Sequence, residues 1–109
     1  MTNLIYLDNN ATTKVDERVL DEMMPYFKEE YANPSSMYNF SKKSSDAIKE
    51  ARVKIRDFVN AKDEKEIFFT SGGTESDNLA LIGAARANRR AGNHLITSAI
   101  EHPAIINTM

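Results

Sequence analysis

The sequence predicts an α/β fold in which helices alternate with short strands of a mainly parallel sheet. Three short segments rich in β-branched, aromatic or leucine side chains, at residues 4–7, 67–70 and 94–98, each come before a helical pattern. Between them, apolar residues recur at helical spacing. Three strands are too few to cover the apolar faces of two long helices, so we expect an incomplete part of such a fold.

The first helix is predicted from its start signals. Residues 4–7 form a short strand, and the Asp-Asn-Asn sequence at 8–10 favours a turn because these side chains bond to nearby backbone. Asp16 is a good N-cap. Pro25 lacks a backbone donor and clashes with the preceding turn, so we expect a kink or two short helices. The apolar residues at helical spacing are Val19, Leu20, Met23, Met24 and Phe27.

A turn and a second helix follow. The Asn-Pro-Ser-Ser sequence at 33–36 favours a turn. Residues 41–59 are predicted to form a helix with one apolar face, and Asn60 is expected to end it in the left-handed conformation. The apolar face contains Ile48, Ala51, Ile55 and Phe58.

The second half repeats the order of strand and helix. The strand at 67–70 leads through two glycines into a helix from Thr74 to about residue 90, and this helix is apolar nearly all round in its middle. Gly92 is expected to end it. Residues 94–98 form the third strand, and Pro103 opens the last helix.

Composition excludes several classes of protein. The 109 residues fit one small domain, and the net charge of −2 gives no reason to expect a nucleic acid or an anionic membrane as partner. No segment resembles a secretion signal or a membrane span, so a cytoplasmic protein is the default. With no cysteine and two histidines, we expect no metal site and no disulfide.

The glycine junction at 71–74 (Ser-Gly-Gly-Thr) is the most informative segment. A strand that leads through glycines into a helix presents free backbone N–H groups and the positive end of the helix dipole, which favours a phosphate site. It is neither a Walker loop nor a dinucleotide fingerprint. An ordinary helix start, with Glu75 and Asp77 compensating the dipole, remains the alternative.

His102 is a second candidate, because it follows a predicted strand and precedes Pro103. In an open α/β sheet, ligands bind beyond the carboxyl ends of the strands, where the glycine junction also lies. An imidazole there can stack on an aromatic ring. The alternative for a single histidine is a helix cap or a surface residue.

Four motifs in order and spacing carry a resemblance to a known family. They are YLDNNATT at 6–13, NPSS at 33–36, FTSGGTESDN at 69–78 and TSAIEH at 97–102. Together they resemble the N-terminal part of the cysteine desulfurases, in the class V branch of fold type I pyridoxal-phosphate (PLP) enzymes. The resemblance implies that residues 1–15 would join the small domain of the complete enzyme and residues 16–109 its PLP-binding large domain.

The resemblance also implies roles for individual residues. Gly73 and Thr74 match the pair that holds the cofactor phosphate. His102 matches the histidine that stacks on the pyridine ring and takes part in proton transfer. Asn10 and Ala11 match a segment near the substrate amino acid. The complete enzyme would be a homodimer that converts L-cysteine to L-alanine and passes sulfur, as a persulfide, to an acceptor protein for iron–sulfur clusters or other uses.

The sequence departs from the family pattern in two ways. After Asn-Pro-Ser-Ser the family usually has a histidine and, three residues on, a glycine, where this chain has Asn39 and Lys42. The family's Schiff-base lysine and nucleophilic cysteine match nothing in this chain, because they come later in the family sequence. We therefore expect a fragment that is inactive alone.

Three other interpretations remain. Selenocysteine lyases and other class V PLP enzymes share the matched motifs. A haloacid-dehalogenase-like phosphatase would use Asp8 as its nucleophile, but Asn10 stands where its second aspartate belongs, and an amide is no general acid. The third is a non-catalytic interaction module.

Overall fold

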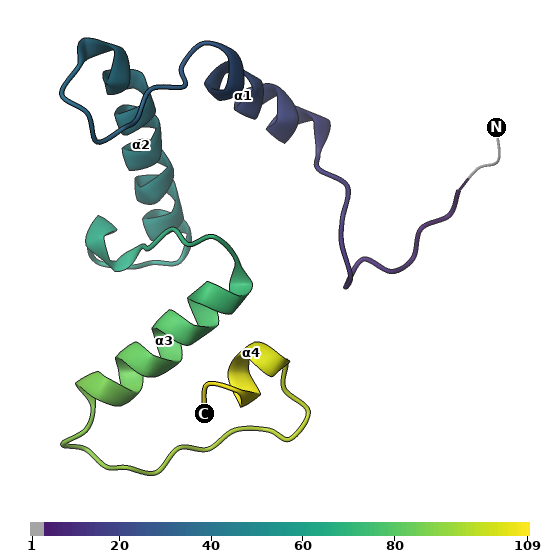
Figure 1. Ribbon diagram of the computed structural model, residues 1–109, viewed down its shortest axis with the longest axis vertical. Helices are drawn as coiled ribbons and strands as arrows, with labels where there is room; N and C mark the ends of the chain where they lie inside the picture. The colour runs from purple at the N-terminus through teal and green to yellow at the C-terminus, as the bar shows by residue number, and fades with distance from the viewer. Residues whose placement is uncertain (1–3) are drawn as a thin grey trace. The chain divides into compact units, whose positions relative to one another are not determined.

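The computed structural model describes residues 4–109 and divides into two compact units, one up to Glu66 and one from Ile67 onward (Figure 1). The first unit contains helices α1 (Glu17–Lys28) and α2 (Lys42–Phe58) with two short 3-10 helices, η1 (Asn39–Ser41) and η2 (Glu64–Glu66). The second contains α3 (Gly73–Ala87) and α4 (Pro103–Ile106).

Helix α1 begins where the sequence predicts. The Asp16 side chain accepts a hydrogen bond from the Arg18 N–H at 2.9 Å and thereby caps the helix. The helix is continuous through Pro25, so the expectation of two short helices is wrong. Pro25 lies in the last turn, where few helical bonds follow it, and its carbonyl accepts from the N–H of Glu29 at 2.8 Å.

The turn at 33–36 and helix α2 are confirmed. The Asn33 side chain accepts from the Ser35 N–H at 2.9 Å, and its carbonyl accepts from the Ser36 N–H at 3.0 Å. Asn60 has a φ of 56°, the predicted left-handed conformation. The Ala61 N–H then reaches back to the Arg56 carbonyl at 2.9 Å, a bond typical of a Schellman motif.

The segment where the sequence departs from the family pattern is regular. Asn39 begins η1, and Lys42 begins α2 and pairs with Asp46 one turn later. The hydroxyl of buried Ser44 donates to the Glu30 carbonyl at 2.7 Å, which ties α2 to the residues after α1. The absence of the family's glycine therefore does not prevent an ordered turn here.

Helix α3 begins at the predicted glycine junction but ends before Gly92. Its last residue is Ala87, and both the backbone N–H and the side-chain amide of Asn88 donate to the Ala84 carbonyl, at 3.0 and 2.8 Å. The helix ends at Asn88, where the backbone leaves the helical conformation with φ −101° and ψ 16°. The prediction that Gly92 ends it is wrong.

None of the three predicted strands is formed within residues 4–109, because residues 4–7, 67–70 and 94–98 all have irregular conformation. A parallel strand is defined by its hydrogen bonds to a neighbouring strand, and a single extended segment does not supply both partners. The described structure is therefore helical where the sequence predicts both helices and strands.

Most apolar side chains of both units are exposed. Ala104 is the one buried apolar residue among those the structure describes. Ile48, Ile55 and Phe58 of α2 and Leu79 and Ile82 of α3 are exposed, although their spacing predicts core-facing positions. Aromatic packing in the first unit includes Tyr31 against Phe40, edge to face at 5.4 Å. No described helix is long and apolar enough to cross a membrane.

Candidate functional site

The turn before α3 is held by side chains that leave the first helical N–H groups unused. The Thr70 hydroxyl donates to the Gly72 carbonyl at 3.2 Å and lies 2.6 Å from the Ser76 hydroxyl. The Ser71 N–H and hydroxyl both donate to one carboxylate oxygen of Glu75, each at 2.7 Å. These contacts fix the turn without using the N–H groups of Gly73, Thr74 or Glu75.

The start of α3 is open to a ligand. The first helical bond runs from the Ser76 N–H to the Gly72 carbonyl at 3.1 Å, so the N–H groups of Gly73, Thr74 and Glu75 have no acceptor in the helix. Gly72 is the N-cap residue and offers no capping side chain. A Cβ added at Gly72 or Gly73 would meet nothing within 4 Å. An anion can therefore approach these N–H groups closely.

Glu75 is a charged neighbour of this position. The N–H of Ser71, and next its hydroxyl, hold the pKa of the Glu75 carboxyl below its ordinary value. The carboxylate is therefore ionised at neutral pH and is bound to Ser71 rather than to the helix N–H groups. The charge of Glu75 in the first turn favours the N-terminal end of α3, which agrees with the alternative of an ordinary helix start.

His102 is the N-cap of α4, as the simpler interpretation of the sequence proposes. Its Nδ1 accepts a hydrogen bond from the Ala104 N–H at 3.1 Å, and its side chain is exposed. A neutral imidazole that accepts at Nδ1 carries its proton on Nε2. Capping uses one ring nitrogen only, so the other nitrogen and the ring faces remain available for a second role.

Helices α3 and α4 are in contact (Figure 1), and the side chain of Asn78 joins them. Its amide nitrogen donates to the Thr74 carbonyl at 2.8 Å and lies 3.4 Å from the Ala104 carbonyl. Thr74 and His102 are therefore connected through side chains of one unit. Asn78 belongs to the motif at 69–78, but no local signal in the sequence marks its contact with a residue 26 positions later.

Asn10 and Ala11 belong to the other unit. They lie in an exposed turn in which the Ala11 N–H donates to the Asp8 carbonyl at 3.1 Å. The turn predicted after residue 7 is thus present. Their role near a substrate stays a prediction.

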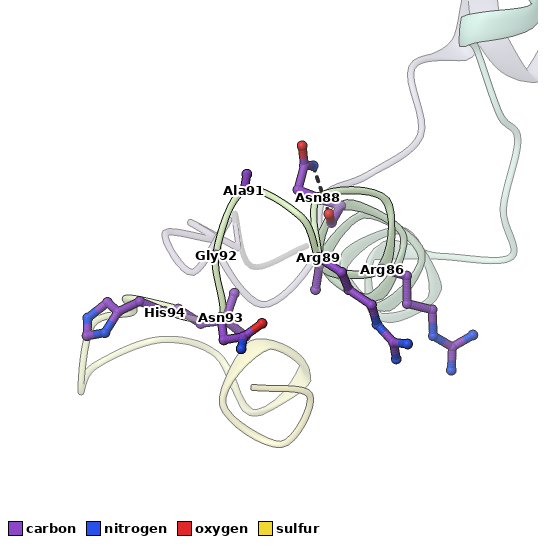
Figure 2. A pocket seen from close by; sticks show the side chains of 10 residues that line it. Arg86, Asn88, Arg89, Ala91, Gly92, Asn93 and His94 are labelled. Carbon is purple, nitrogen blue, oxygen red and sulfur yellow. Dashed lines mark hydrogen bonds between the residues drawn. The ribbon is translucent and has the colours of Figure 1, made fainter.

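The opposite end of α3 borders a hollow of about 610 Å³, whose lining includes Arg86, Asn88, Arg89 and His94. Figure 2 shows that the two guanidinium groups extend away from the imidazole of His94. The basic groups therefore do not converge on one ligand position. Within residues 4–109, no group of three acidic or histidine side chains is placed to hold a metal ion.

Comparison with known proteins gives a consistent result. Residues 5–109 match the family described as Aminotransferase class-V. The cysteine desulfurase IscS of Clostridium botulinum (strain Kyoto / Type A2) is 50% identical over 108 residues, which are 99% of this chain and 27% of that protein. The cysteine desulfurase IscS of Methanosarcina thermophila is 53% identical over 104 residues, or 95% of this chain and 26% of that protein.

A solved structure of a NifS-like protein matches with a TM-score of 0.85 and 39% identity, and the match covers 95% of this chain and 28% of that one. The described chain thus has the fold of the corresponding part of that protein. It spans about a quarter of the length of the curated relatives it matches.

Proposed function

The chain belongs to the class-V aminotransferase family, and on that basis we propose that it is the N-terminal part of a PLP-dependent cysteine desulfurase. The complete protein would convert L-cysteine to L-alanine and pass the sulfur to an acceptor protein, for iron–sulfur cluster assembly or another use. Relatives named cysteine desulfurase, about 50% identical over nearly the whole chain, support this function over the phosphatase and the non-catalytic module.

The observation that carries the proposal is the open N-terminus of α3 in the same unit as His102. Three N–H groups without helical acceptors, beside two glycines with free space around them, suit a phosphate dianion. Gly73 and Thr74 would hold the phosphate of PLP, with the Thr74 hydroxyl as a further donor. These residues fit the cofactor phosphate, because no side chain makes a capping hydrogen bond at this helix end.

PLP, when bound, supplies an electron-withdrawing ring that stabilises negative charge developing on the substrate. His102 would lie against this ring and hold a proton at Nε2, since Nδ1 accepts from the Ala104 N–H. Asn10 and Ala11 would lie near the substrate amino acid. The 109 residues contain no cysteine, so the thiol that accepts sulfur would belong to the rest of the complete protein.

In the complete protein, residues 16–109 would form the N-terminal part of the large domain of a fold type I enzyme, and residues 1–15 would join its small domain. Residues 4–7, 67–70 and 94–98 would become strands once neighbouring strands supply hydrogen-bond partners. The likeness to the NifS-like protein over 95% of the chain supports this arrangement. The protein would be a cytoplasmic homodimer.

The test is direct measurement of products. The complete protein with PLP and L-cysteine is expected to form alanine and, with a thiol reductant, sulfide in equal amounts. L-selenocysteine in place of L-cysteine distinguishes a selenocysteine lyase. Hydrolysis of a phosphate ester without either amino acid would favour the phosphatase instead, and no product from any substrate would leave the non-catalytic module.

The isolated 109-residue chain is expected to release no sulfide from L-cysteine under the same conditions, because it has no thiol to accept the sulfur. Sulfide release by the purified chain at a rate proportional to its concentration would contradict the assignment of the chemistry to the rest of the protein.

A further inference from the structure

We infer that Asn78 is a positioning residue whose side-chain amide fixes the imidazole of His102 relative to the N–H groups at the start of α3. The inference rests on the proposed function, because it concerns residues that would hold the phosphate and the ring of PLP. It concerns contacts within the second unit only.

The orientation of the Asn78 amide follows from its partners. The nitrogen lies 2.8 Å from the Thr74 carbonyl oxygen and 3.4 Å from the Ala104 carbonyl oxygen. Carbonyl oxygens only accept hydrogen bonds, so the amide nitrogen rather than the amide oxygen faces both of them. The contact with Thr74 is the stronger of the two, by its length.

The oxygen of the same amide is used as well. The Thr108 hydroxyl lies 2.8 Å from the Asn78 side-chain oxygen and 2.7 Å from the Ala104 carbonyl, and its one proton is shared between these acceptors. Asn78 and Thr108 are half-buried, and Ala104 is buried. Partial exclusion of water strengthens such contacts and makes a broken one costly.

The backbone of Ala104 connects these contacts to His102. The Ala104 carbonyl is held by Asn78 and Thr108, while its N–H donates to His102 Nδ1 at 3.1 Å. A shift of the carbonyl would move the N–H and weaken the bond that fixes the ring and its tautomer. Asn78 therefore acts on the imidazole through one residue of backbone.

Asn88 provides a matched control. Its amide donates to the Ala84 carbonyl at 2.8 Å, the same distance as the Asn78 bond to Thr74, with the same spacing of four residues on the same helix. Asn88 lies at the opposite end of α3, beside the hollow shown in Figure 2. Asn88→Leu therefore reports the loss of that one bond at an exposed position, whereas Asn78→Leu also removes the contacts with Ala104 and Thr108.

The first test uses the complete protein saturated with PLP. Asn78→Leu is expected to lower turnover of L-cysteine by about ten- to a hundredfold, with little change in KM, because the ring is displaced while the substrate still binds. In a His102→Asn background the same substitution should cause no further loss, since no imidazole remains to be positioned. Asn88→Leu should change turnover by less than about twofold. Equal losses in both backgrounds would overturn the inference.

The second test does not depend on activity or on PLP. With selectively ¹⁵N-labelled histidine in the cofactor-free complete protein, the ring shifts of His102 should report an unprotonated Nδ1 and a protonated Nε2. Asn78→Leu should give a mixture of tautomers. An unchanged tautomer overturns the inference, even in a protein that turns over L-cysteine.

Thr108→Val removes the hydroxyl that contacts Asn78 and the Ala104 carbonyl. This variant tests the inference if Asn78→Leu does not fold. It should shift the His102 tautomer in the same direction by a smaller amount, and an unchanged tautomer in this variant would count against the inference. If the complete protein neither binds PLP nor acts on L-cysteine, the proposed function fails, while the tautomer still reports whether Asn78 positions His102.

Discussion

Helices α1 and α3 begin in opposite ways. The start of α1 is closed by Asp16, whose carboxylate accepts from the Arg18 N–H at 2.9 Å and from the Arg18 guanidinium at 2.8 and 3.0 Å. The start of α3 has a glycine at the same position, and its first N–H groups have no capping side chain. Both helix ends carry the same partial positive charge.

The two helix ends differ in the anion that compensates this partial positive charge. At α1 the protein supplies its own anion, and the hydrogen bonds from Arg18, first from its side chain, keep the pKa of Asp16 below its ordinary value. At α3 the nearest carboxylate, that of Glu75, is bound to Ser71 instead. A capped helix end is a structural element, whereas an open one beside glycines is suited to an external anion.

The largest effect is expected from adding a capping carboxylate at the N-terminus of α3, as Asp16 provides for α1. Gly72→Asp places a carboxylate where it can accept from the N–H groups of the first turn and repel a phosphate. Loss of two charge-assisted hydrogen bonds, each about 1.5–3 kcal/mol, should weaken PLP binding to the complete protein by about a hundredfold or more. Titration followed by cofactor absorbance measures it.

Two controls accompany that variant. Gly72→Ala adds no acceptor, has free space for its Cβ, and should leave PLP affinity within about threefold of the parent. Asp16→Gly opens α1 and should lower the melting temperature slightly without changing PLP affinity. Equal weakening of PLP binding by Gly72→Ala and Gly72→Asp would show that the negative charge is not responsible.

Replacement of His102 should lower turnover rather than cofactor affinity. His102→Asn keeps a side chain that can cap α4 but removes the imidazole. Turnover of L-cysteine is expected to fall by about a hundredfold at saturating PLP, in the range typical of a lost proton carrier. The cofactor absorbance spectrum should also shift. A variant with the parent spectrum and turnover would leave His102 with the role of a helix cap alone.

Thr74 should show the opposite pattern. Thr74→Ala removes one charge-assisted hydrogen bond to the phosphate, worth about 1.5–3 kcal/mol, so PLP affinity should fall by about ten- to a hundredfold with the spectrum nearly unchanged. Thr74→Ser retains the hydroxyl and should retain most of the affinity. The assignment is contradicted if Thr74→Ser binds PLP as weakly as Thr74→Ala.

The smallest effect concerns the carboxylate bound to Ser71. Because the folded-state pKa of Glu75 is lowered, its contribution to stability is fully present above its unfolded value, near 4.5, and is lost as pH falls through the lower folded-state pKa. The melting temperature of Glu75→Gln should therefore lie slightly below that of the parent at pH 7 and approach it below pH 4. A difference that does not depend on pH would mean that the charge of Glu75 is not responsible.

Local signals in the sequence were enough for much of the helical structure. Asp16 begins α1, Asn60 ends α2 in the left-handed conformation, and the glycine junction begins α3, because each effect acts within about one turn of backbone. Two predictions of helix extent were wrong: the break into two short helices at Pro25 and the end of α3 at Gly92. Pro25 is tolerated in a last turn, and the backbone of α3 leaves the helical conformation at Asn88, before Gly92.

Contacts between distant residues had no local signal. The predicted strands are absent from residues 4–109, since a strand requires hydrogen bonds from a neighbouring segment, which its own sequence does not supply. The sequence alone indicated Gly73, Thr74 and His102 as separate candidates, and the resemblance to the cysteine desulfurases assigned all three to the cofactor. Only the tertiary structure joined them through Asn78, Ala104 and Thr108, because these partners lie 26 and 30 residues apart and meet only when α4 packs against α3.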